Sequence, residues 1–233
     1  MEEPTATPDH PCHWAASTLR AILSRESLLL LGATVLLVAH RQLGRGPSRA
    51  LWPFEPGYWW YATAIVAFLL LPLLLIVLFL RQPPTDFGLA VGRVKEWLPA
   101  VLILYLLVFP FLYFASHQPQ FRALYPLLPT ARVGGPALVR FELTYGAYFF
   151  AWEFFFRGFL LFGLAKKFGP LAIPLQTVPF VFAHLNKPYP EVYASLFAGL
   201  ALGALALRTR SMLPCFLLHW AAALTLDLLV LYR

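Results

Sequence analysis

The chain has 233 residues, of which 60% are hydrophobic and only 12% are charged. Soluble domains are about 45–50% apolar and about 25% charged, so this composition, with a mean hydropathy of +0.68, excludes an ordinary soluble protein. The net charge of +7 comes mostly from Lys and Arg between the apolar runs, where they meet water and lipid headgroups, and it therefore indicates a membrane surface and not nucleic acid.

The N-terminal segment, residues 1–26, begins with the acidic, proline-rich sequence MEEPTATPDHPCHW. It has no basic segment leading into an apolar core, so it does not have the pattern of a cleaved signal peptide, and we expect a short disordered tail. Cys12 and Cys215 are too few for a disulfide framework or a zinc cluster. Cys215 lies in an apolar run and is expected to be a packing residue.

Residues 27–233 are expected to form a single all-α domain, a polytopic transmembrane helical bundle. A helix needs about 20 apolar residues to cross a bilayer, and about seven segments approach or reach that length. In chain order they are Leu28–Ala39 (short unless it begins near Ala21), Tyr58–Leu80, Trp97–Ser116, Leu138–Leu164, Leu171–His184, Pro190–Leu207 and Met212–Tyr232. Prolines and glycines between the third and fourth predict a loop with a short interfacial helix.

The protein is therefore expected to be integral and multi-pass, in the inner (plasma) membrane of the cell. Its orientation stays open, because the loops on the two sides carry nine and eight cations, a difference too small to decide under the positive-inside rule.

Ionisable side chains are concentrated in the last four predicted spans. Such a group within a span costs at least about 2.5–3.5 kcal/mol on insertion scales, so it is usually paired, pore-facing or functional. Glu153 and Arg157 lie in the fourth span, His184 closes the fifth, and His219 and Asp227 lie in the seventh. A lone His in a span is more often a packing residue, but a Glu and two His on three helices favour one shared site.

Three motifs carry a resemblance to a known family. They are Glu153-Phe-Phe-Phe-Arg157-Gly158, then Phe180-Val-Phe-Ala-His184, then His219 in the last span. In this order they resemble the CAAX-protease and bacteriocin-processing family of glutamic-type intramembrane endopeptidases, whose motifs read Glu-Glu-x-x-x-Arg, Phe-x-x-x-His and His-x-x-x-Asn/Asp. The resemblance covers the C-terminal part of the chain, within residues 137–233.

The chain departs from the family pattern at two positions. Trp152 stands where the family has its first glutamate, which is usually given the water-activating role, and Ala223 stands where it has Asn or Asp. A compensating carboxylate is therefore expected from Glu153 itself, Glu191 or Asp227, and Asn186 is a further candidate for a supporting side chain.

The resemblance implies an intramembrane endopeptidase, similar to CAAX prenyl proteases, that hydrolyses a peptide bond of a membrane-anchored peptide or protein. We expect Glu153 to deprotonate a water with the help of His184, His219 to donate to the oxyanion, and Arg157 to orient Glu153. The expected partners are membrane lipids and this substrate, with no nucleic acid.

Three alternatives stay open. No cofactor is expected, but Glu153, His184 and His219 also make a zinc ligand set with an open position, although the chain has no His-Glu-x-x-His helix. A degenerate, non-catalytic family member that acts as a membrane scaffold or chaperone is favoured by Trp152 and Ala223. A transporter or channel has less support, because inverted repeats are not evident.

Overall fold

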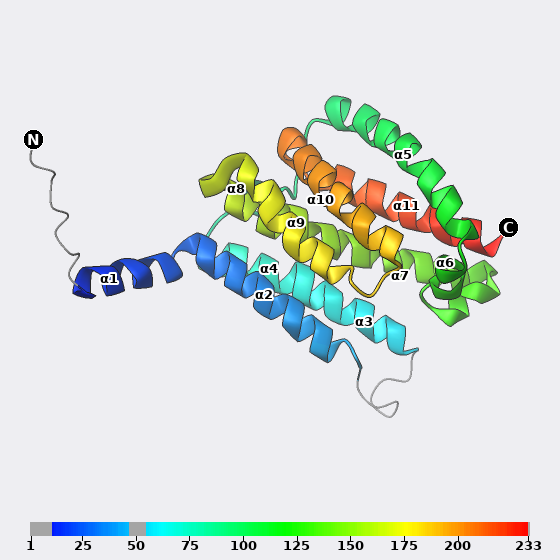
Figure 1. Cartoon of the computed structure of the whole chain (residues 1–233), viewed down its shortest axis with the longest axis horizontal. Helices are drawn as coiled ribbons and strands as arrows, with labels where there is room; N and C mark the ends of the chain where they lie inside the picture. Colours follow the sequence, from blue (N-terminus) through cyan, green and yellow to red (C-terminus); the bar gives the residue numbers. More distant parts are fainter. Residues whose placement is uncertain (1–10, 47–54, 233) are drawn as a thin grey trace, which may run out of the picture.

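The computed structural model describes residues 11–46 and 55–232, and this part of the chain is a bundle of helices without a strand (Figure 1). The predicted all-α membrane fold is confirmed. Six stretches are long and apolar enough to cross a membrane, namely Arg25–Leu43, Pro56–Phe79, Val94–His117, Gly135–Ala183, Tyr189–Thr209 and Leu213–Leu231. The fourth stretch, of 49 residues, runs along the bundle and back (Figure 1), so it contains both the fourth and the fifth predicted spans.

The N-terminal half holds helices that flank the central ones on two sides, with residues 25–79 on one side and residues 94–117, against Leu213–Leu231, on the other (Figure 1). They are α1 (Pro11–Ile22), α2 (Arg25–Leu43), α3 (Pro56–Ile65), the π turns η1 (Val66–Leu70) and η2 (Leu75–Phe79) on either side of α4 (Leu71–Leu74), the 3₁₀ turn η3 (Pro84–Phe87) and α5 (Val94–His117). The expected disordered tail is wrong for residues 11–22, which form α1. After Pro11 this segment has no further proline or glycine and is rich in alanine, a composition that favours a helix.

The C-terminal half forms the centre of the bundle. It consists of α6 (Pro119–Leu124), η4 (Pro129–Val133), α7 (Gly135–Glu153), the π-helical segment η5 (Phe154–Phe162), α8 (Gly163–Phe168), η6 (Gly169–Leu171), α9 (Ala172–Ala183), α10 (Tyr189–Thr209) and α11 (Leu213–Leu231). The short helix α6 corresponds to the interfacial helix expected between the third and fourth spans.

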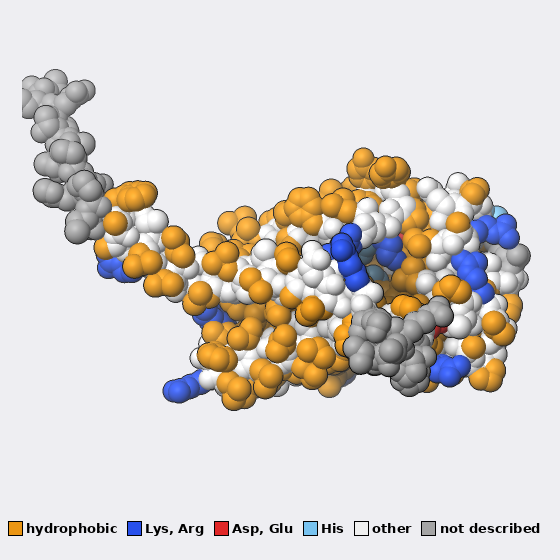
Figure 2. All heavy atoms as spheres, turned by 90° about the horizontal axis from the view of Figure 1, so that it is seen from below, with side chains coloured by type: hydrophobic (Ala, Val, Ile, Leu, Met, Phe, Trp, Pro, Cys, Tyr) orange, Lys and Arg blue, Asp and Glu red, His pale blue; other side chains and the backbone are white. Residues whose placement is uncertain are grey.

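Burial separates the central helices from those that face lipid. Of the 18 most apolar consecutive residues in the stretch from α7 to α9, 78% are buried, whereas none of the corresponding 18 residues of α5 is buried. Leu102, Leu106 and Phe111 of α5 are more than half exposed, and hydrophobic side chains cover much of the face seen in Figure 2. A surface of this kind is stable only in contact with acyl chains.

The helix α9 is too short to cross a bilayer by itself. Its 12 residues extend about 18 Å at 1.5 Å per residue, against a hydrocarbon core of about 30 Å. His184 and the irregular segment up to Pro188, which precedes α10, therefore begin at membrane depth. Irregular backbone is tolerated there only inside protein or beside a water-filled cavity.

Candidate active site

Glu153 is the centre of a polar network at the junction of α7 and η5. Its side chain is completely buried, and its Oε1 accepts a hydrogen bond from Arg157 Nη1 at 3.1 Å and one from His219 Nδ1 at 2.6 Å. Arg157 follows four residues later, so it returns to the same helix face, as predicted. His219 comes from α11, which packs beside α7.

Arg157 is held by an aromatic face as well as by Glu153. Its guanidinium carbon lies 4.0 Å from the centroid of the Phe180 ring, which belongs to α9, and its side chain is fully buried. A guanidinium over an aromatic face is attracted by the ring quadrupole, more strongly where water is excluded. The cation therefore compensates the Glu153 carboxylate and also joins η5 to α9.

His184 caps the C-terminal end of α9 and points back into the bundle. Its Nδ1 lies 2.7 Å from the carbonyl oxygen of Phe180, which can only accept, so Nδ1 carries the proton and Nε2 is left with a lone pair. The imidazole packs edge-on against Trp152, with centroids 5.6 Å apart. It is nearly parallel to the His219 ring, at 19° and 6.4 Å between centroids.

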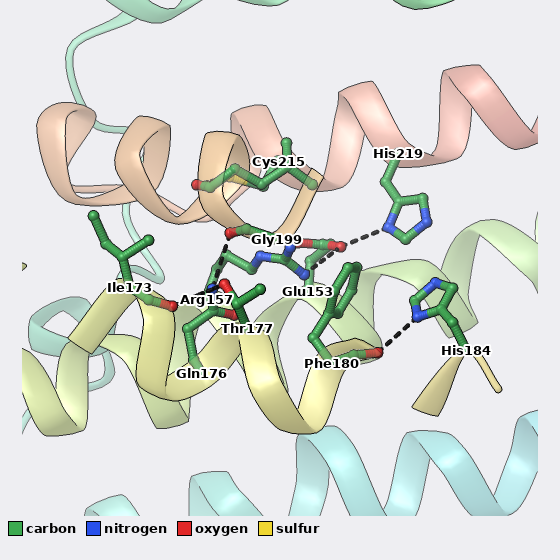
Figure 3. A network of polar contacts seen from close by, with 11 residues as sticks. Glu153, Arg157, Ile173, Gln176, Thr177, Phe180, His184, Gly199, Cys215 and His219 are labelled. Carbon is green, nitrogen blue, oxygen red and sulfur yellow. Dashed lines mark hydrogen bonds and ion pairs between the residues drawn. The ribbon is translucent and has the colours of Figure 1, made fainter. Parts of the chain in front are cut away.

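The structure thus brings Glu153, Arg157, His184 and His219 together, with the two imidazoles on the same side of the network (Figure 3). The carboxylate and the guanidinium are inaccessible to solvent, whereas the His219 side chain is 21% exposed and His184 is 8% exposed. In Figure 2 a histidine side chain is visible in a hollow on one face, with basic side chains beside it. Water that enters the site therefore meets the imidazoles before the carboxylate.

The two departures from the family motifs have different surroundings. Trp152 is 6% exposed and lies in an aromatic cage of Phe68, Tyr148 and Phe156, from which it faces His184. The place of the family's first glutamate is therefore filled by an indole that covers one side of the histidine. Ala223 packs on the aromatic cluster around Tyr145 and Phe149 and adds no polar group to the site.

The three candidate supporting residues contact groups outside the network. Asn186 Oδ1 accepts a hydrogen bond from Arg41 Nη2 at 3.1 Å, and both oxygens of Glu191 accept from the Tyr125 hydroxyl at 2.7 Å. Asp227 is completely buried beside Glu142 of α7. None of the three has a recorded hydrogen bond to Glu153, His184 or His219 within the described part of the chain.

Two polar groupings were missed by sequence reasoning. Glu142, 7% exposed, lies beside Asp227 and the Trp220 indole, and the four carboxyl oxygens of the two acidic side chains are buried. The signal for Glu142 was its spacing, since it precedes Glu153 by eleven residues, about three helical turns on one face.

The second missed grouping lies beside Glu191, where Lys187 Nζ donates to the Tyr125 hydroxyl at 2.7 Å. Burial lowers the pKa of Lys187, although the Glu191 carboxylate raises it again. Burial also raises the pKa of Tyr125, and Glu191 adds to this shift. The signal in the sequence was Lys187 itself, four residues before Glu191 and at the start of a span.

Two of the atoms that a zinc ion could use already bond to other groups in this arrangement. The Glu153 oxygen that faces His219 is already bonded to a guanidinium, and the same His219 nitrogen donates to that oxygen. No group of three His, Cys, Asp or Glu side chains with metal-binding geometry occurs within residues 11–46 and 55–232. Zinc at Glu153 Oε1 would have to displace Arg157, and zinc at His219 Nδ1 would need the ring to turn, whereas Glu153 Oε2 has no hydrogen-bond partner among the described residues.

Comparisons with known proteins identify the family of this region. Residues 135–225 match the family model described as "Type II CAAX prenyl endopeptidase Rce1-like", which confirms the family predicted from the three motifs. The match begins at α7 and ends within α11, so it contains all four residues of the network. No curated protein and no solved structure gives a match.

Proposed function

Because residues 135–225 match the Rce1-like family, we propose that this multi-pass membrane protein is an intramembrane endopeptidase that hydrolyses a peptide bond of a membrane-anchored peptide or protein. The observation that carries the proposal is the convergence of Glu153, His184 and His219 from three helices at membrane depth. Three separate desolvation costs are then explained by one site.

Hydrolysis at this site needs a water, a group that takes its proton and a position for the peptide carbonyl. The Glu153 carboxylate is the source of negative charge, and Arg157 compensates it. His184 and His219 stand at the accessible edge, with nearly parallel rings 6.4 Å apart. A water bound to one imidazole is therefore within reach of the other, which supports hydrolysis that depends on the glutamate and on both histidines.

We also propose that the reaction is metal-free. This rests on Arg157, which is bonded to the same Glu153 oxygen as His219 and compensates its charge. The test is cleavage activity after exhaustive dialysis against a chelator, with metal content measured in parallel. Activity that is unchanged in metal-depleted protein supports the proposal, and activity that returns only with added zinc contradicts it.

The substrate is proposed to approach within the membrane. Lipid-facing helices surround the site, so the partners that fit are membrane lipids and a peptide segment anchored beside the bundle, and not nucleic acid. We place the protein in the inner (plasma) membrane of the cell, which fractionation of the source cells tests directly.

A second function, a non-catalytic scaffold or chaperone, is favoured by one observation. Trp152 fills the place of the family's first glutamate and covers one side of His184. In that case alanine at His184 or His219 would change partner binding or stability, and no peptide would be cleaved by the wild-type protein.

The experiment that separates the two functions uses purified protein in vesicles with a membrane-anchored peptide, whose products are identified by mass spectrometry. We expect cleavage by the wild-type protein and its loss in Glu153→Ala and His184→Ala. Unchanged cleavage in both variants would end the proposal.

A further inference from the structure

The two histidines of the site differ in the partner of their Nδ1 atoms. His184 Nδ1 is 2.7 Å from the neutral carbonyl of Phe180, whereas His219 Nδ1 is 2.6 Å from the carboxylate of Glu153. Both partners only accept, so Nδ1 is protonated in each ring and Nε2 is the basic nitrogen. Only the His219 ring therefore has a negative charge placed to stabilise its imidazolium form.

The position of Glu153 explains why its charge acts through His219. The carboxylate has no exposed surface, and its Oε1 already accepts from Arg157 and His219. His219, by contrast, is 21% exposed. Water reaches the imidazole without moving the ion pair, but it reaches Glu153 only if a buried contact opens.

We propose that His219 is the general base of the peptidase reaction, with Glu153 and Arg157 as positioning residues. This inference rests on the proposed function. His219 Nε2 takes a proton from the water, whose oxygen attacks the peptide carbonyl carbon. The proton on His219 Nδ1 stays on that nitrogen and keeps its hydrogen bond to the Glu153 carboxylate. The imidazolium then returns the proton from Nε2 to the departing nitrogen as the C–N bond breaks. The products are a carboxylic acid and an amine, and no oxidant, reductant or metal is consumed.

Neighbouring groups hold the ring in the orientation that this chemistry needs. Phe149 packs against His219 with 4.4 Å between centroids, and Phe180 carries Arg157 on its face. His184 Nε2 accepts a hydrogen bond from the same water and so fixes its direction of attack. The assignment differs from direct proton transfer to Glu153 by one measurable feature, the identity of the group that titrates.

The kinetic test compares pH–rate profiles of the wild-type protein, His219→Gln, Glu153→Gln and the double variant in vesicles. We expect His219→Gln to lose at least about 100-fold in kcat and to lose the acidic limb of the profile. Glu153→Gln is expected to lose a similar factor, because the imidazole loses the carboxylate that orients it. The double variant is expected to be no slower than either single one.

Glu142→Gln is the matched control, since it is the same substitution on the same helix face about three turns away. It is expected to keep the wild-type profile. If His219→Gln keeps the acidic limb, or if the losses in the double variant multiply, Glu153 takes the proton itself and the assignment is overturned. An altered profile in Glu142→Gln would also overturn it, because the profile would then follow general disturbance of α7.

A second measurement needs no substrate. A proton shared between a histidine nitrogen and a carboxylate at 2.6 Å gives a strongly downfield NMR resonance. We expect this signal in the wild-type protein, in His184→Gln and in Glu142→Gln, and its absence in Glu153→Gln and His219→Gln. If the signal is present but no peptide is cleaved, the contact between His219 and Glu153 is confirmed, but the proposed function and the role of His219 as general base are both wrong. If the wild-type protein cleaves the peptide but gives no such signal, the proposed function is supported and the role of His219 as general base is wrong.

Discussion

Two buried carboxylates on one face of α7 are treated differently by the fold. At the C-terminal end of the helix, Glu153 is bonded to a guanidinium and an imidazole. About three turns earlier, Glu142 has polar contacts to another carboxyl group, that of Asp227, and to the Trp220 indole, and neither carboxyl group is bonded to a cation among the described residues. Both sites lie between α7 and α11, in the same low-dielectric interior.

The comparison shows what a functional carboxylate needs within a membrane bundle. A buried charge is expensive unless it is paired, and Glu153 has a pair that holds its charge in place beside an accessible ring. The Glu142–Asp227 pair has no cation in direct contact among the described residues, and Lys187 and Arg132 act on Asp227 only at longer range. We therefore expect substitutions at the Glu153 site to change stability and cleavage strongly, and substitutions at the Glu142–Asp227 pair to change them little.

The largest effect is expected from Arg157→Met. Removal of the guanidinium leaves Glu153 buried with only His219, and breaking a buried ion pair costs about 3–5 kcal/mol. Thermal unfolding in detergent measures this loss. The double variant Glu153→Leu with Arg157→Met removes both charges and is expected to recover most of the stability. If the double variant is no more stable than the single one, the guanidinium does not act by compensating Glu153.

The next largest effect is expected from Trp152→Glu, which places the family's first glutamate among the aromatic side chains that surround Trp152. The new carboxylate has no cation of its own there, and loss of a buried aromatic side chain alone costs about 3 kcal/mol. We expect a lower unfolding temperature and no gain in cleavage, with Trp152→Phe as the tolerated control. A stable Trp152→Glu protein that cleaves faster would contradict this, because Arg157 would then compensate the charges of two carboxylates.

A smaller effect is expected from Gly146→Ala, between the two carboxylate sites. A Cβ at this position would lie 2.7 Å from the Trp220 ring, and overpacking of this kind costs about 1–3 kcal/mol. Gly32→Ala is the control, because nothing lies within 4 Å of the added carbon and an alanine in a helix gains about 0.5–1 kcal/mol. Equal unfolding temperatures for the two variants would contradict close packing of α7 against α11.

The smallest effect is expected from Asp227→Asn. The amide keeps the shape of the side chain and gives Glu142 an N–H donor, so stability is expected to change by no more than about 1 kcal/mol. Cleavage is expected to stay at the wild-type rate. A large loss of cleavage, without a loss of folded protein, would show that the pair takes part in the reaction.

Sequence reasoning predicted the network better than its surroundings. Glu153 and Arg157 follow from helical spacing, and the histidines follow from the cost of placing polar groups in spans. The contact between Asp227 and Glu142 could not be predicted, because the rotation of α11 against α7 that brings them together is not encoded in any local pattern. The proton position on each histidine was also out of reach, since it depends on partners from other helices.

The most direct measurement is the pH–rate profile of His219→Gln beside that of the wild-type protein, with a membrane-anchored peptide in vesicles. We expect the wild-type protein to cleave the peptide more slowly as the pH falls, and the variant to lose both the rate and this pH dependence. A variant that cleaves at the wild-type rate, or a wild-type protein that cleaves no membrane-anchored peptide, would contradict it.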